Sequence, residues 1–205
     1  MIRVERKDEP AGFNELVRVP GKAYTEKNPN KKPPELWKKC KSDLYKAYDG
    51  YCAYTTFKIN GQLNAVVDHF LPGSHHPEQL YEWSNYRLSS FHINSVKKDC
   101  ESIADPFELP ENAYRLANDM SIEVNPDAFS DEESRALAHK TIQRLKLNRP
   151  EWLADRADMI EEALKLEKEA IEGDMAYHLL ISDQLYKQSR FLHQEAVRMG
   201  YVKPV

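Results

Sequence analysis

Apolar residues recur at three- and four-residue intervals after Pro34, which is the spacing of a helix with one buried face. The recurring positions are Leu36, Trp37, Cys40, Leu44 and Ala47. Proline is favoured in the first turn of a helix and glycine at its end, so this helix is expected between Pro34 and Gly50. The chain before it is dense in proline, and residues 1–33 are expected to form an extended arm.

Strand-like segments follow at residues 51–57 and 63–69. The dipeptide Asn60-Gly61 lies between them and favours the positive φ of a tight turn, so the two segments are expected to pair as a hairpin. A short helix is expected at 91–98. Residues 34–100 are therefore predicted to form a compact α+β core with a leading helix.

Helical patterns dominate the second half of the chain, whereas residues 113–124 are ambiguous. We expect helices from Ser130 to Asn148, from Pro150 to about Glu172, and from Asp174 to Met199. Ser130 and Glu133 have the spacing of a capping box. Residues 101–205 are thus expected to form a helical accessory region. They carry more apolar surface than a core of some fifty residues would cover, so they either pack on one another or bind a partner.

Charge is distributed unevenly, although the chain as a whole has a net charge of −4. Residues 1–50 hold twelve basic and eight acidic side chains, residues 51–100 hold four of each, and residues 101–205 hold thirteen basic and twenty-one acidic side chains. No apolar run approaches the roughly 20 residues that a membrane span needs. Three scattered cysteines suggest free thiols, so a cytoplasmic location is expected.

An acid, an imidazole and two amides stand where a single-metal nuclease would need them. Hydrolysis of a phosphodiester requires a base that activates water and a cation that neutralises the leaving oxygen. His69 is the candidate base, because imidazole titrates near neutral pH. Asp68 and Asn94 offer hard oxygen ligands for the cation, and Asn85 is expected to tie the intervening loop together.

Four segments follow one another in the order Tyr48–Thr55, Val66–Pro72, Tyr81–Leu88 and Asn94–Asp99, and the last three contain Asp68, His69, Asn85 and Asn94. Together they resemble the HNH endonuclease family over about residues 48 to 99. The resemblance implies the ββα-metal fold, in which two short antiparallel strands and a helix hold one magnesium or manganese ion. It implies His69 as the general base, Asp68 and Asn94 as metal ligands, and Asn85 as the loop-ordering residue of the catalytic motif.

Many members of that family carry two Cys-x-x-Cys pairs that hold a structural zinc. Here the first pair reads Cys52 and Thr55, and the positions that match the second are Ser90 and Ile93. One cysteine out of four does not make a zinc site, so no structural zinc is expected.

Three basic side chains near the motif are candidate phosphate contacts, namely Arg87, Lys97 and Lys98. The sequence therefore predicts a metal-dependent HNH nuclease that cuts DNA. It looks similar to the small HNH subunits of Septu-type and retron-type anti-phage systems, which implies an ATPase partner bound through the C-terminal helices. The alternative is a catalytically silent nucleic-acid-binding or adaptor subunit that keeps the HNH shape.

Overall fold

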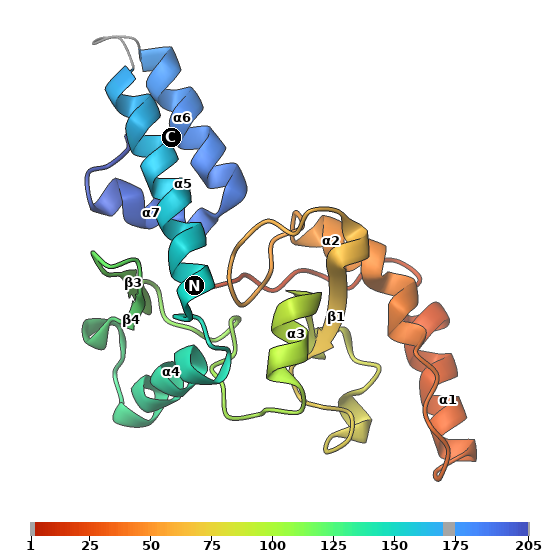
Figure 1. The fold of residues 1–205 in the computed structure, drawn as a ribbon. Coiled ribbons are helices and arrows are strands. Elements are labelled where there is room, and N and C mark those ends of the chain that lie inside the picture. The colour runs from red at the N-terminus through yellow and green to blue at the C-terminus, as the bar shows by residue number, and fades with distance from the viewer. Residues whose placement is uncertain (1–2, 170–174, 205) are drawn as a thin grey trace. The chain divides into compact units, whose positions relative to one another are not determined.

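The computed structural model describes residues 3–169 and 175–204 (Figure 1). Contacts between Cα atoms divide them into two compact units. The N-terminal unit comprises residues 5–54 and 59–101. The C-terminal unit comprises residues 102–204 together with residues 3–4 and the short segment 55–58.

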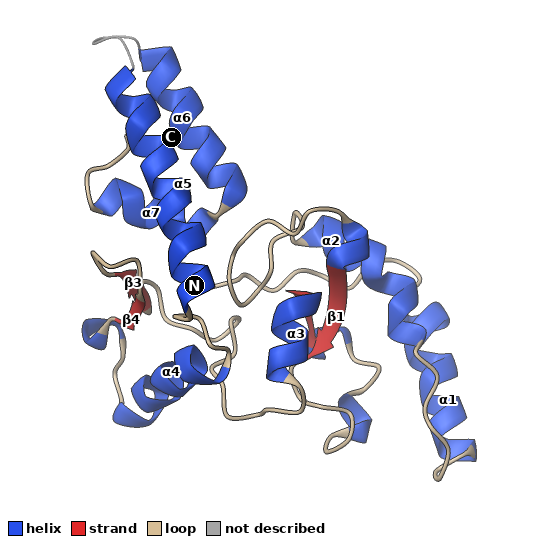
Figure 2. Ribbon diagram, in the orientation of Figure 1, coloured by secondary structure: helices blue, strands red, loops and turns tan. Residues whose placement is uncertain are grey.

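The N-terminal unit contains short helices and one two-stranded sheet (Figure 2). In chain order its elements are the π-helix Asn14–Arg18, α1 (Val19–Lys27), the 3₁₀-helix Leu36–Cys40, α2 (Lys41–Ala47), the 3₁₀-helix Gln62–Asn64, β1 (Ala65–His69), the 3₁₀-helices Pro77–Gln79 and Trp83–Asn85, β2 (Tyr86–Ser90) and α3 (Phe91–Lys97). Helices thus occupy residues 14–27, where the prolines predicted an extended arm. Pro20 stands in the first turn of α1, a position that needs no backbone N–H, so it permits the helix.

Strands β1 and β2 pair antiparallel, with Ala65 opposite Ser90 and His69 opposite Tyr86. The chain then turns directly into α3, because the Ser90 side chain caps that helix by accepting a hydrogen bond from the Ile93 N–H. Helix α3 packs against both strands, and Ile93 is fully buried. The order strand, strand, helix therefore forms one local unit.

The predicted hairpin between 51–57 and 63–69 was wrong. Asn60-Gly61 does form a turn, with Gly61 at φ +79°, but the partner of β1 is β2. Residues 86–89 are all buried, and α3, which follows β2 directly, packs against both strands and so holds β2 beside β1. The earlier segment instead meets the far side of β2, where the Ala53 N–H donates to the Leu88 carbonyl at 2.8 Å.

The C-terminal unit is mostly helical. Its elements are β3 (Tyr114–Leu116), β4 (Ile122–Val124), the 3₁₀-helix Pro126–Ala128, α4 (Glu132–Arg144), α5 (Pro150–Glu169), α6 (Met175–Gln188) and α7 (Arg190–Arg198). Strands β3 and β4 pair antiparallel, α4 contacts β4, and α5, α6 and α7 pack together. Ile160, Ile181 and Leu192 form part of its buried core. No helix in the described part of the chain is both long and apolar enough to span a membrane.

The helices of this unit begin and end at positions that differ in part from the sequence prediction. Helix α4 is capped by Asp131, which accepts from the Ser134 N–H at 2.7 Å, and not by Ser130. The predicted third helix is interrupted at Ser189, whose extended backbone and hydroxyl cap the start of α7. The predicted end of the second helix at Glu172 and the start of the third at Asp174 lie outside the described residues. The mixed α+β class is confirmed.

Candidate active site

His69 ends strand β1 and is half-buried among aromatic rings. The Trp37 ring meets it edge to face at a centroid distance of 4.8 Å, and the Tyr86 ring does the same at 5.1 Å. Trp37 belongs to the 3₁₀-helix before α2, which is distant from His69 in sequence. The imidazole is therefore held by packing from two separate parts of the N-terminal unit.

Hydrogen bonding fixes the tautomer of this imidazole. His69 Nε2 lies 2.9 Å from the Leu80 carbonyl oxygen, and a carbonyl only accepts, so Nε2 carries the proton. Nδ1 is left as an acceptor, and it makes no hydrogen bond within the described residues. Burial lowers the pKa of His69 from 6.5 to about 4, so the ring is neutral at neutral pH. A neutral ring with a bare nitrogen is the form that can accept a proton from water.

Asp68 precedes His69 and is almost completely buried, at 3% exposure. Its Oδ2 accepts a 2.5 Å hydrogen bond from the Tyr54 hydroxyl, and its Oδ1 lies 3.2 Å from the ammonium of Lys97. Burial raises the pKa of the Asp68 carboxyl, while Lys97 and Tyr54 act in the opposite direction. The ammonium of Lys97 thus occupies the position beside Asp68 Oδ1 that a bound metal ion would take.

Asn94 lies one helical turn before Lys97 on α3. It is half-buried, and its side-chain amide makes no hydrogen bond with the described residues. A carboxylate and an amide oxygen form a donor set that suits a hard divalent ion. The described residues contain no group of three or more His, Cys, Asp or Glu side chains that would hold a metal by themselves. Water and phosphate oxygens would have to complete the shell.

Asn85 joins the two ends of the loop between β1 and β2. Its Oδ1 accepts from the Leu71 N–H at 2.8 Å, and its Nδ2 donates to the carbonyls of Leu71 at 2.9 Å and Gln79 at 3.1 Å. The backbone of Asn85 also accepts from the Phe70 N–H. These bonds are the loop-tying contacts expected of Asn85 from the sequence. They act on the loop that presents the Leu80 carbonyl to His69.

Lys97 and Arg87, two of the predicted phosphate contacts, lie in the interior of the protein. The Lys97 side chain is fully buried, where it donates to the His69 carbonyl at 2.8 Å and pairs with Asp68. Arg87 is 2% exposed, donates to the carbonyls of Ser84 and Tyr86, and stacks over Phe70. Cations this deep are held by protein oxygens and do not meet a ligand at the surface. Lys98 is exposed and remains a candidate phosphate contact.

The positions that would hold structural zinc have other roles in this fold. Cys52 is buried as a free thiol near the Ser89 hydroxyl, while Ser90 caps α3 and Ile93 fills the core behind it. Packing and one helix cap therefore stabilise this end of the sheet.

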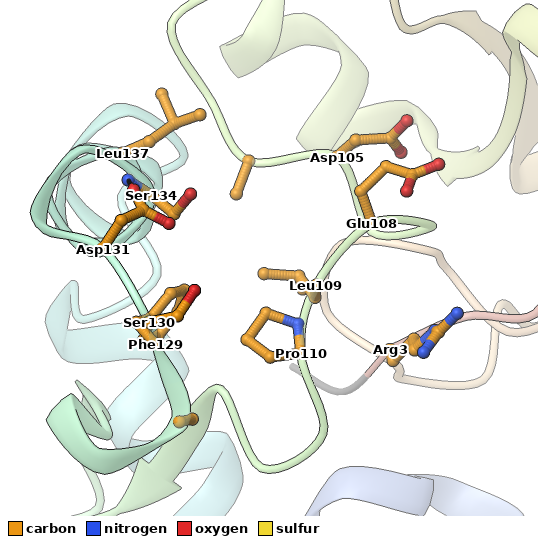
Figure 3. Close-up of a pocket in the computed structure, with 12 residues that line it drawn as sticks. Arg3, Asp105, Glu108, Leu109, Pro110, Phe129, Ser130, Asp131, Ser134 and Leu137 are labelled. Carbon is orange, nitrogen blue, oxygen red and sulfur yellow. Dashed lines mark hydrogen bonds between the residues drawn. The ribbon is translucent and has the colours of Figure 1, made fainter.

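The C-terminal unit contains a pocket of about 400 Å³ (Figure 3). Asp131 and Ser134 line it from the start of α4, and Asp105 and Glu108 line it from the opposite segment. The pocket is lined by three carboxylates and one cation, Arg3, so its net negative charge disfavours a phosphate ligand. None of the candidate nuclease residues lies in this pocket.

No protein-family model matches this chain, and no characterised protein has a sequence significantly similar to it. Sequence reasoning missed Trp37 and Tyr54, which hold His69 and Asp68 in place. Trp37 lies outside the four motif segments, and Tyr54 lies in the first of them, but neither residue carries a sequence signal for its contact, which only the fold creates.

Proposed function

We propose that this chain is a metal-dependent endonuclease of the HNH type that hydrolyses DNA phosphodiester bonds. One observation carries the proposal: His69 stands at the end of an antiparallel strand pair that leads into a helix, with its Nε2 bound to a carbonyl and its Nδ1 bare. This arrangement corresponds to the ββα order that the HNH resemblance implies.

In this proposal His69 Nδ1 takes the proton from the attacking water. Its low pKa keeps the ring neutral, although it also makes the ring a weak base. An anionic phosphate bound nearby would raise that pKa toward the working range. The Leu80 carbonyl holds the ring in the reactive tautomer, and Asn85 holds the loop that carries this carbonyl.

A magnesium or manganese ion would be held by Asp68 and Asn94. Bound there, it would neutralise charge on the phosphate and the leaving oxygen. The donor set fits a hard cation, and the half-buried amide of Asn94 makes no hydrogen bond with the described residues. Lys97 would share Asp68 with the ion or be displaced from it, because it already lies against Oδ1.

The C-terminal unit is proposed to bind an ATPase partner, as in the anti-phage systems that the sequence resembles. In support of a partner, α6 keeps several apolar side chains exposed, namely Met175, Leu179, Leu180 and Tyr186. The partner would restrain the nuclease or deliver it to foreign DNA. Co-purification of an ATPase from the native host with this chain, abolished when Leu180 is changed to Glu, would support this part of the proposal.

Cleavage of supercoiled plasmid by the purified chain tests the nuclease proposal. The expected result is nicking or linearisation in magnesium or manganese, none in chelator, and none with His69→Ala. His75→Ala is the matched control, since His75 is an exposed histidine of the loop that follows β1. Cleavage that persists in His69→Ala would refute the proposed base.

The second candidate is a silent adaptor that binds nucleic acid without cutting it. The buried Asp68–Lys97 pair favours it, because this contact occupies the carboxylate that a metal would need. Isothermal titration with manganese separates the two candidates. Binding that disappears in Asn94→Ala supports the nuclease, and no binding to the native chain supports the adaptor.

A further inference from the structure

The strongest positive charge in the N-terminal unit lies in residues 27–41, which we call the basic segment. It contains six lysines and one glutamate, Glu35. Five of the lysines are exposed: Lys27, Lys31, Lys32, Lys38 and Lys39. Among the described residues, the segment's one ion pair joins Lys38 to Glu35 at 2.5 Å. Most of its charge is therefore not neutralised by the protein.

Two contacts fix the basic segment next to the candidate base. The Tyr81 hydroxyl donates to the Pro34 carbonyl at 2.9 Å, and Trp37 packs against the ring of His69. Cys40 at its far end is buried. The segment is thus built into the unit, and its exposed lysines flank the residue that packs on His69.

Two carboxylates of this unit, Glu82 and Asp68, are already paired with other cations. Glu82, on the loop between β1 and β2, is paired with Arg18 and Lys22. Asp68 is buried with Lys97. An anion that approaches His69 would therefore meet the lysines of the basic segment without a competing exposed carboxylate from these two residues.

We propose that the basic segment is a binding surface for the phosphate backbone of DNA, and that it guides the duplex to His69. This inference rests on the proposed function, because it assigns the substrate-binding surface of the same site. Lysine ammonium groups contact phosphates as point charges and do not read bases. Binding is therefore independent of sequence and strongly weakened by salt.

The test compares two variants of the full chain in which the same amount of positive charge is removed. The first carries Lys31→Gln, Lys32→Gln, Lys38→Gln and Lys39→Gln. The control carries Lys140→Gln, Lys146→Gln, Lys165→Gln and Lys168→Gln, four exposed lysines of the C-terminal unit. Fluorescence anisotropy measures binding to a labelled 30-base-pair duplex in EDTA, across a salt series, and circular dichroism verifies that both variants fold.

The basic-segment variant should bind at least tenfold more weakly, and its log–log salt slope should fall by about 0.9 for each DNA phosphate that the removed lysines had neutralised. The control should stay within twofold of the native chain. Equal affinity of the two variants, or no binding by the native chain, would overturn the inference. Because EDTA prevents cleavage, selective weakening of binding supports the surface even if the nuclease assay fails. Conversely, metal-dependent cleavage with unchanged binding by the basic-segment variant refutes the surface alone.

Discussion

The ammonium of Lys97 lies 3.2 Å from Asp68 Oδ1 and donates to the carbonyl of His69 at 2.8 Å. One buried cation from α3 therefore fixes both neighbouring residues of the candidate site at the end of β1. Lys97, which the sequence suggested as a DNA contact, is buried here and holds Asp68 and the His69 backbone in place.

Lys97→Met should destabilise the chain by about 3 to 5 kcal/mol, because it leaves Asp68 buried without its cation. Lys98→Met is the matched control, since the adjacent lysine is exposed, and it should change stability by less than about 0.5 kcal/mol. Urea unfolding followed by circular dichroism measures both. Equal, small effects would mean that Lys97 is not the buried partner of Asp68.

The sequence predicted the local elements of the site well. The strand that ends in Asp68-His69 and the helix at 91–97 were both expected, because turn residues and apolar spacing mark them locally. The partner of β1 was missed, because the alternation of apolar and polar residues at 86–89 is only four residues long, whereas Asn60-Gly61 signalled a hairpin turn to an earlier segment.

The burial of Lys97 and the helix break at Ser189 were not predicted from the sequence, for physical reasons. A lysine is normally assigned to the surface, since burying its charge requires a specific partner that sequence alone does not identify. Lys97 finds that partner in Asp68, twenty-nine residues earlier in the chain. The break at Ser189 was also missed, because it carries neither proline nor glycine, the residues that usually signal a helix end.

Asn85→Ala should remove three hydrogen bonds to the loop backbone and leave the Leu71 N–H and the Gln79 carbonyl without this partner. We expect a decrease of about 2 kcal/mol in unfolding free energy, together with reduced cleavage because the loop positions the Leu80 carbonyl. Asn64→Ala serves as the control, since Asn64 makes one exposed bond to the Asn60 carbonyl. If the two variants unfold at the same urea concentration, Asn85 does not order the loop.

Trp37→Ala should expose the imidazole of His69 and raise its pKa from about 4 toward 6.5. Trp37→Phe keeps an aromatic ring in place and should leave the pKa close to the native value. Titration of the imidazole by NMR measures both. An unchanged pKa in Trp37→Ala would show that Trp37 does not shield the base.

Stability should depend on the protonation of His69. Its pKa is lowered to about 4 in the folded chain from 6.5, so the unfolded chain binds the proton more readily. The stabilisation is present above pH 6.5 and is lost as the pH falls toward 4, by about 2 kcal/mol between pH 7 and pH 5. His69→Gln should lack this component. Urea unfolding of both proteins at pH 7 and pH 5 measures it, and equal decreases in the two proteins would contradict the assignment.

Whether His69 is the general base of a nuclease is tested by the single-turnover cleavage rate of a DNA duplex in magnesium, measured for the native chain, His69→Ala and His75→Ala. We expect His69→Ala to lower the rate at least about a hundredfold, as for removal of a general base, and His75→Ala to stay within twofold of the native rate. Equal rates for the native chain and His69→Ala would contradict the claim that His69 is the base of a nuclease.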